Sequence, residues 1–162
     1  MAPRLATIAD VPALVRLINR AYRVEDFFID GDRTHEAEVR MRLAKPDAAF
    51  LVVPAAGDAE TLAAAVYLEV HGARGYFAML SVDPAYQKRG LGRMLTEAVE
   101  AHCRARGCAF VAIEVVNLRE ELPAFYARLG FTPDGTAPFP DPAKLTRDAH
   151  LVLMSKPIRG EE

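Results

Sequence analysis

The sequence predicts an α/β domain with a mixed, mostly antiparallel central sheet flanked by helices. Three apolar segments, residues 50–53, 62–70 and 76–82, read as strands joined by short turns, which favour antiparallel neighbours. A helical segment separates residues 76–82 from a further apolar strand at residues 110–116, so this pair should be parallel. No internal repeat or linker divides the chain, and we expect a single domain over residues 1–162.

Composition and charge describe an ordinary globular protein. The net charge of −2 gives no reason to expect nucleic acid or an anionic membrane as partner. No apolar run approaches the roughly 20 residues of a membrane span, and the first ten residues lack the apolar core of a secretion signal, so we expect a cytoplasmic protein. Cys103 and Cys108 read as small buried side chains. The four histidines lack metal-ligand spacing, so we expect no metal site.

The first third of the chain should form a short strand and two helices. Residues 4–8 are expected to be a strand, and Asp10 should cap the amino end of a helix that contains Pro12 near its start. A second helix should cover residues 35–44 and stop before Pro46. The first helix carries an apolar stripe at helical spacing, formed by Leu14, Leu17, Ile18 and Tyr22.

The last part of the chain should contain a loop and a final strand. Residues 135–142 include three prolines and read as a loop, whereas residues 150–154 read as a strand. We expect the tail from Pro157 onward to be frayed.

A glycine-containing basic loop lies between the strand at residues 76–82 and a helix that runs to about Arg106. Its sequence is Gln87-Lys88-Arg89-Gly90-Leu91-Gly92, and Asp83-Pro84 ends the strand before it. The unpaired N–H groups and the positive end of the helix dipole form an anion site at such a helix start. Glycine allows the anion to approach the backbone. The sequence therefore predicts a binding loop for phosphate or pyrophosphate.

Two motifs identify the kind of phosphate-binding loop. A Walker loop is not present, and a dinucleotide fingerprint would need a third glycine where this chain has Leu95. The remaining pattern, Gln-x-x-Gly-x-Gly, is followed about thirty residues later by Phe125-Tyr126-Ala127-Arg128-Leu129-Gly130-Phe131. Together they resemble the acyl-CoA motifs of the GNAT superfamily of N-acyltransferases, over residues 4–156.

The resemblance implies how acyl-CoA would bind. The parallel strand pair would splay apart and hold the pantetheine arm, with backbone groups of Leu80 and Val82 as partners. The pyrophosphate would contact the loop and the first turn of the helix, that is Gln87, Lys88, Arg89, Gly90, Leu91, Gly92 and Arg93. Family members commonly carry an asparagine seven residues before the tyrosine. Here that position is Arg119, so either Asn117 contacts the arm or Arg119 replaces it.

The reaction implied by the resemblance is acetyl transfer from acetyl-CoA to a primary amine, by direct attack through a tetrahedral intermediate. Tyr126 would be the catalytic acid that protonates the departing thiolate, and a backbone N–H near Val82 would stabilise the oxyanion. An alkylammonium has a pKa near about 10.4, so a base must take its proton. Glu69, Glu114 or water are the candidates.

Several alternatives stay open from the sequence. Residues 22–34 mix aromatic side chains with four carboxylates and two arginines, and read either as a solvated loop or, by the resemblance, as the acceptor-binding element. The acceptor could be a small molecule or a peptide amine, and the oligomeric state is open, with a homodimer among the options. A non-catalytic CoA-binding sensor or interaction module, or an acyltransferase acting on alcohols, would share the same fold.

Overall fold

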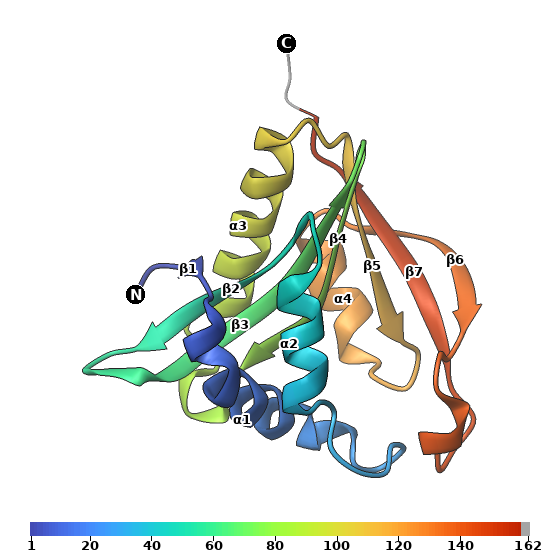
Figure 1. Ribbon diagram of the computed structural model, residues 1–162. Helices are drawn as coiled ribbons and strands as arrows, with labels where there is room; N and C mark the ends of the chain where they lie inside the picture. Colours follow the sequence, from blue (N-terminus) through green and yellow to red (C-terminus); the bar gives the residue numbers. More distant parts are fainter. Residues whose placement is uncertain (160–162) are drawn as a thin grey trace.

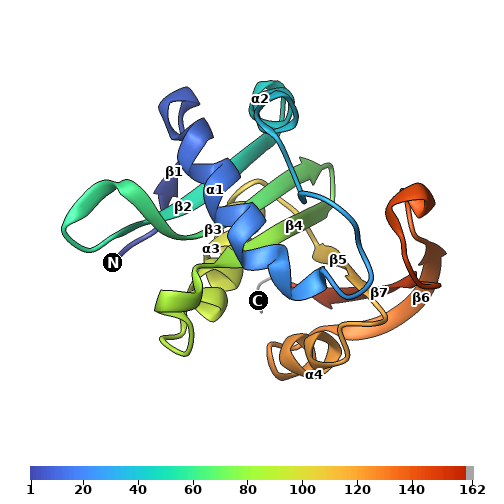
Figure 2. The same ribbon diagram turned by 90° about the horizontal axis from the view of Figure 1, so that it is seen from below.

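The computed structural model describes residues 1–159 and contains one seven-stranded sheet with helices on both faces (Figures 1 and 2). The strand order is β1-β2-β3-β4-β5-β7-β6. The strands are β1 (Arg4–Leu5), β2 (Ala48–Ala55), β3 (Asp58–His71), β4 (Arg74–Val82), β5 (Phe110–Val116), β6 (Thr132–Pro138) and β7 (His150–Pro157). All neighbours are antiparallel except β4 and β5, which are parallel. The predicted fold class is therefore confirmed.

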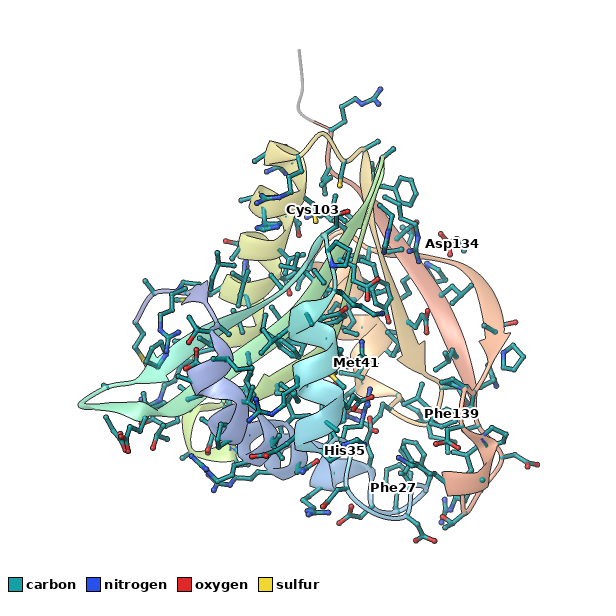
Figure 3. All side chains as sticks on the ribbon, in the orientation of Figure 1. Phe27, His35, Met41, Cys103, Asp134 and Phe139 are labelled. Atoms are coloured by element: carbon teal, nitrogen blue, oxygen red, sulfur yellow. The ribbon has the colours of Figure 1, made fainter. Side chains whose placement is uncertain are left out.

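Within residues 1–159, four α-helices cover the sheet, two on each face. They are α1 (Val11–Ala21), α2 (Glu36–Ala44), α3 (Leu91–Ala105) and α4 (Glu121–Arg128). Viewed along the sheet, α1 and α2 lie on one side, and α3 and α4 lie on the other (Figure 2). Each side has its own apolar core, centred on Ile18 and Tyr67 under α1 and on Leu95 and Phe77 under α3. Cys103 and Cys108 are buried in the second core, as predicted, and Figure 3 shows Cys103 on α3. None of the described helices is long and apolar enough to cross a membrane.

The chain before α1 differs in detail from its prediction. The strand stops at Leu5, and Ile8–Asp10 forms a 3-10 turn instead. The side chain of Asp10 accepts hydrogen bonds from the Thr7 N–H at 2.8 Å and from Arg4 at 2.9 Å. Asp10 does sit at the start of α1, but these bonds direct its carboxylate backward, so it does not cap that helix. At the start of α2, His35 Nδ1 accepts from the Glu38 N–H at 3.3 Å (Figure 3).

The carboxyl-terminal part is more ordered than predicted. The prediction of a loop at residues 135–142 is wrong for residues 135–138. These belong to the edge strand β6, Thr132–Pro138, whose partner among the described strands is β7. An edge strand tolerates proline since one side of it needs no donors. The prediction that the tail is frayed from Pro157 onward is also wrong for Pro157 and Ile158. Pro157 is the last residue of β7, and Ile158 is buried and its N–H donates to the Ala109 carbonyl at 3.0 Å. Residues 160–162 lie outside the described part of the chain.

Candidate active site

The parallel strands β4 and β5 separate after a short paired stretch. Their register covers only Arg74–Tyr76 opposite Phe110–Ala112. Beyond it, β5 continues alongside β7 and β4 continues alongside β3, so the two strands diverge (Figure 1). The splayed pair that the family resemblance implies is therefore present.

A β-bulge lies in β4 on this diverging part. Met79 has a left-handed backbone conformation with φ of 57°, and the register with β3 shifts at this point. As a result Ala78 and Met79 both pack on the α1 side of the sheet, and Leu80 and Val82 pack on the α3 side. Bulges are frequent beside active sites because they redirect side chains and interrupt pairing. No glycine marks this one, so sequence reasoning missed it.

The loop at residues 87–92, which is predicted to bind phosphate and is called the phosphate-binding loop below, has the conformation expected of an anion site. Lys88 and Gly90 are both left-handed, with φ of 64° and 78°, and Gly90 is the residue immediately before the 15-residue helix α3. Gln87 through Gly90 are exposed. A side chain on Gly92 would lie 3.4 Å from the Phe125 ring, so this glycine lets the start of α3 approach α4. The loop therefore presents backbone N–H groups to solvent at the positive end of a long helix.

The basic side chains of this region differ in their availability. The Arg89 guanidinium stacks over the Tyr86 ring at 5.0 Å, and Arg93 donates to Glu97 at 2.9 Å. Lys88 has no ion pair among the described residues. Leu91 is buried in the core, so only its backbone faces the loop. The backbone amides and Lys88 are consequently the groups most available to a pyrophosphate.

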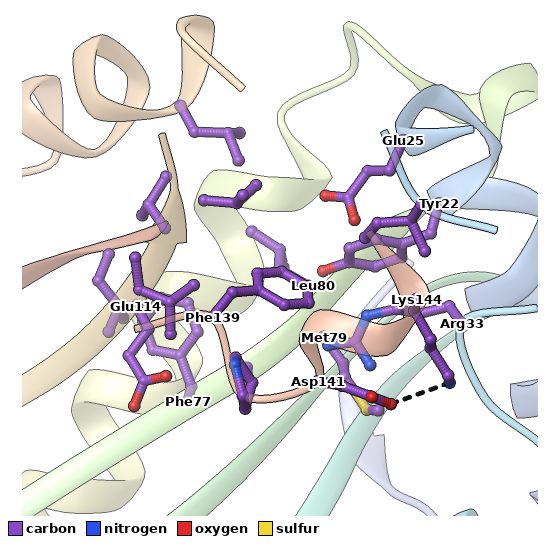
Figure 4. Close-up of a pocket in the computed structure, with 18 of the residues that line it drawn as sticks. Tyr22, Glu25, Arg33, Phe77, Met79, Leu80, Glu114, Phe139, Asp141 and Lys144 are labelled. Carbon is purple, nitrogen blue, oxygen red and sulfur yellow. Dashed lines mark ion pairs between the residues drawn. The ribbon is translucent and has the colours of Figure 1, made fainter. Parts of the chain in front are cut away.

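A cavity of about 400 Å³ opens where β4 and β5 diverge (Figure 4). Its walls come from loop 22–34, α2, the two diverging strands, α4, and the connection between β6 and β7. The polar and ionisable residues that line it are Tyr22, Glu25, Asp32, Arg33, Glu38, Arg42, Tyr76, Glu114, Tyr126, Asp141 and Lys144. Figure 4 shows Glu114 on one side and Tyr22, Glu25 and Arg33 on the other. Leu80 also lines the cavity, while Val82 lies beyond it along β4.

Tyr126 contributes a phenol to the cavity wall. The residue is only 6% exposed, and its ring packs against Phe77, Phe125 and Phe131 at centroid distances of 5.0 to 6.0 Å. Burial, and secondarily the neighbouring Tyr22, raises the pKa of Tyr126 well above its usual value. The hydroxyl is neutral at physiological pH, as an exposed phenol also is, and burial makes it a weaker acid.

Glu25, Arg119 and Glu121 form an ion-pair network beside Tyr126. The Arg119 guanidinium contacts Glu25 at 3.1 Å and Glu121 at 2.9 Å. Burial raises the pKa of Glu25, more than the charge of Arg119 lowers it. Glu25 belongs to loop 22–34 and Glu121 to α4, so Arg119 links the loop to the helix that carries Tyr126.

Asn117 and Arg119 were the alternatives for the contact with pantetheine, and both have partners within the protein. The side-chain oxygen of Asn117 accepts a hydrogen bond from the backbone N–H of His150 at 2.8 Å. The backbone N–H of Asn117 donates to the His150 carbonyl. Asn117 thus extends the pairing of β5 with β7, whereas Arg119 binds the two glutamates described above.

The two candidate bases occupy different environments. Glu69 does not line the cavity; it accepts hydrogen bonds from Tyr67 and His71 and pairs with Lys45 at 3.4 Å. Burial alone would raise the pKa of Glu69, but these partners together lower it to about 2, which makes it a poor proton acceptor. Glu114 is exposed and lines the cavity.

The connection between β6 and β7 was missed as part of the site. It meets loop 22–34 through a bridge between Ile29 and Leu145 and through the Asp30 N–H, which donates to the Lys144 carbonyl at 2.9 Å. Phe139 and Lys144 reach the cavity from this connection (Figure 4). Only tertiary pairing brings it there, and the sequence carries no local signal for that pairing.

These features fit acetyl-CoA. The strand separation leaves room for an extended arm beside β4, and the left-handed turn at Lys88 and Gly90 opens the helix start to phosphate. The arm would end beside Leu80 and Tyr126, which both line the cavity.

Comparison with known proteins agrees with this geometry. The model of the acetyltransferase (GNAT) family matches residues 11–131. The IAA acetyltransferase of Azospirillum brasilense is 28% identical over 148 residues, covering 90% of this chain and 91% of that protein. A mycothiol acetyltransferase of Saccharopolyspora erythraea is 32% identical over 129 residues, which are 77% of this chain but only 41% of that protein.

Solved structures share the fold. The ribosomal-protein-S18-alanine N-acetyltransferase of Escherichia coli superposes with a TM-score of 0.78 at 21% identity, over 99% of this chain and 96% of that one. An aminoglycoside 6'-acetyltransferase type Ii superposes with a TM-score of 0.77 at 17% identity, over the full length of both chains. With the family match and the acyl-CoA features described above, the chain belongs to the GNAT acetyltransferase family and is an acetyl-CoA-dependent N-acetyltransferase.

Proposed function

We propose that this enzyme acetylates a primary amine, of a small molecule or a peptide, that binds in the cavity between β4, β5 and loop 22–34. The observation that carries the proposal is that one cavity joins the point of strand divergence, the buried Tyr126 phenol and the polar loop 22–34. The cavity therefore offers room for an acceptor directly beside the expected position of the acetyl group.

Bound acetyl-CoA supplies a thioester whose acetyl group is open to attack by a neutral amine. Tyr126 is the candidate donor of a proton to the departing sulfur, because its phenol lines the cavity where the thioester is expected. The N–H groups of the bulged part of β4, near Leu80 and Val82, are the candidates to stabilise negative charge on the acetyl oxygen.

Removal of the proton from the amine falls to a carboxylate that lines the cavity. Glu114 is the candidate from the sequence that meets this condition. Glu25 is a second one, and its raised pKa brings it closer to neutrality, where a general base is most effective. Water between these groups and the amine would complete the transfer.

The experiment that tests this function measures thiol release from acetyl-CoA with a panel of amines, and identifies the acetylated product by mass spectrometry. An enzyme of this class should release thiol and form an N-acetyl product with at least one amine. Binding of acetyl-CoA without turnover on any amine would favour the non-catalytic sensor. O-acetylated products alone would favour an acyltransferase for alcohols.

A further inference from the structure

Two arginines line the cavity: Arg33 has no carboxylate partner among the described residues, and Arg42 has a distant one. The Arg33 guanidinium lies over the Tyr22 ring at 5.1 Å and makes no ion pair among the described residues. Arg42 stacks over the Tyr67 ring at 4.7 Å, and its nearest carboxylate, that of Glu38, is 3.7 Å away. Both guanidinium groups are thus held by aromatic rings rather than by full ion pairs.

Arg42 also has a buried polar atom with no partner. Its Nε is inaccessible to solvent and makes no hydrogen bond with a described residue. A buried donor without an acceptor is costly, and native structures usually satisfy it. Glu38, which could have served, is held by a hydrogen bond from the Thr34 hydroxyl. Because this Nε is inaccessible even to water, a ligand in the cavity would have to contact the other nitrogens of the Arg42 guanidinium.

The acidic residues of the cavity are mostly neutralised by other cations. Glu25 is paired with Arg119 at 3.1 Å, and Asp32 is paired with Arg23 at 2.6 Å. Neither Arg119 nor Arg23 lines the cavity. The carboxylates at this end of the cavity are therefore already compensated.

Asp141 pairs with Lys144 at 3.8 Å within the wall itself (Figure 4). Glu114 is the one lining carboxylate without a cation partner among the described residues. When the 3.7 Å pair between Arg42 and Glu38 is counted, one guanidinium group of the lining, that of Arg33, and one carboxylate, that of Glu114, have no ion-pair partner among the described residues.

Tyr76 also lines the cavity, and the charges of Arg33 and Arg42 both act on its pKa. Burial, and secondarily Glu114, raises the pKa of Tyr76 to about 12, while the charges of Arg42 and Arg33 act in the opposite direction. Its neutral hydroxyl is a further donor on the same wall. Two guanidinium groups and a phenol are donors that suit a carboxylate or a phosphate.

We propose that the acceptor amine carries an acidic group, and that Arg33 and Arg42 bind this group inside the cavity. This inference rests on the proposed function, since it names the substrate class of the same site. The acceptor is an amino-carboxylate or an amino-phosphonate or -phosphate, small enough for a cavity of about 400 Å³. Its amine then lies toward Tyr126 and Glu114, away from the arginines.

The test compares α-amino acids with their amides and with the matching amino-phosphonates, in the thiol-release assay. The amide keeps the size and removes the charge, and its amine has the lower pKa, so intrinsic reactivity favours the amide. A preference for an acidic acceptor of tenfold or more therefore supports the inference. A stronger preference for the phosphonate supports it also, and identifies the acidic group as phosphate-like.

Arginine variants connect this preference to the site. Arg33→Gln and Arg42→Gln should each raise the KM for the acidic acceptor by roughly 10- to 100-fold, as expected for a lost charge-assisted hydrogen bond. The KM for acetyl-CoA should change little. Arg40→Gln is the matched control, because Arg40 is on the same helix as Arg42 but is exposed and outside the cavity wall. It should leave all constants near those of the parent.

The outcomes separate this inference from the proposed function. Equal use of acids and amides, with no selective effect of the arginine variants, would overturn the acidic acceptor while leaving the acetyltransferase intact. If no amine is acetylated, the proposed function fails. In that case thermal stabilisation by the same acids in the presence of CoA, abolished by Arg33→Gln or Arg42→Gln but not by Arg40→Gln, would still establish the acid-binding site. Its absence would refute the site.

Discussion

The Arg119 guanidinium contacts the Glu25 carboxylate at 3.1 Å, and the two residues are 94 positions apart in the chain. Their side chains are only 15% and 8% exposed. The pair joins loop 22–34, where the acceptor is proposed to bind, to the start of the helix that carries Tyr126.

We predict that Arg119→Gln destabilises the protein by about 3 kcal/mol, because it leaves the Glu25 carboxylate buried without its partner. Urea unfolding measures this loss. The double variant Arg119→Gln/Glu25→Gln should recover much of the stability, since no buried charge remains. Arg93→Gln breaks the exposed pair with Glu97 and should cost no more than about 1 kcal/mol. Equal losses for the two single variants would contradict the interpretation of Arg119.

Glu25 and Glu69 should change the free energy of unfolding in opposite directions as the pH rises. Burial raises the pKa of Glu25 in the folded state, so between about pH 4.5 and that raised value the folded protein binds more protons than the unfolded chain. The stability of the parent relative to Glu25→Gln should therefore fall as the pH rises through this window. The pKa of Glu69 is lowered to about 2, so the stability of the parent relative to Glu69→Gln should rise between about pH 2 and 4.5.

Urea unfolding of the parent and of both variants across pH 3 to 8 checks this prediction. The difference between parent and variant isolates one carboxyl group from all others. Differences that move in the same direction with pH for Glu25 and Glu69 would contradict the environments described here.

Tyr126→Phe should reduce turnover by about 100- to 10,000-fold if the phenol protonates the departing thiolate. The ring and its contacts with Phe77, Phe125 and Phe131 survive, so acetyl-CoA binding and folding should change little. Steady-state kinetics on a good acceptor, together with calorimetric titration of CoA, measures both effects. Turnover near that of the parent would leave Tyr126 as a packing residue, with water as the proton donor.

Acetyl-CoA at about 100 times its dissociation constant should stabilise the parent by about 2.7 kcal/mol. Gly90→Glu should abolish this stabilisation, because it places bulk and negative charge at the phosphate-binding loop. Gly57→Glu is the matched control. Gly57 also has a left-handed backbone, with φ of 79°, and open space around it, but it lies in the turn between β2 and β3.

Thermal unfolding with and without CoA compares the two variants. Both should lose similar intrinsic stability through backbone strain, whereas only Gly90→Glu should lose the response to CoA. The same response to CoA in both variants would mean that the loop at residues 87–92 does not bind the pyrophosphate.

The sequence predicted those features whose chemistry is local. Proline after Asp83 ends β4, and Gly90 opens α3, so the strand, loop and helix around the phosphate-binding loop were predicted close to their observed bounds. The apolar stripe of α1 was predicted for the same reason, since Leu14, Leu17 and Ile18 recur at helical spacing and are buried.

The features that sequence analysis missed depend on tertiary contacts. The bulge at Met79 uses no glycine, and the edge strand β6 forms despite its prolines because β7 supplies its hydrogen bonds. Sequence analysis did not single out Arg42, because only the packing of α2 in the folded protein brings this side chain to the cavity. Glu69 appeared free to act as a base, but neighbours from β3 and from Lys45 hold it.

The bridge between Ile29 and Leu145 joins two distant segments of the chain. The phosphate-binding loop is made from consecutive residues, and closing a short loop has a low entropic cost. The wall of the cavity formed by loop 22–34 and the connection between β6 and β7 instead needs two segments more than 100 residues apart to meet, and closing so long a loop costs more entropy. Loss of this contact would therefore be expected to affect the binding of the acceptor before it affects the loop at residues 87–92.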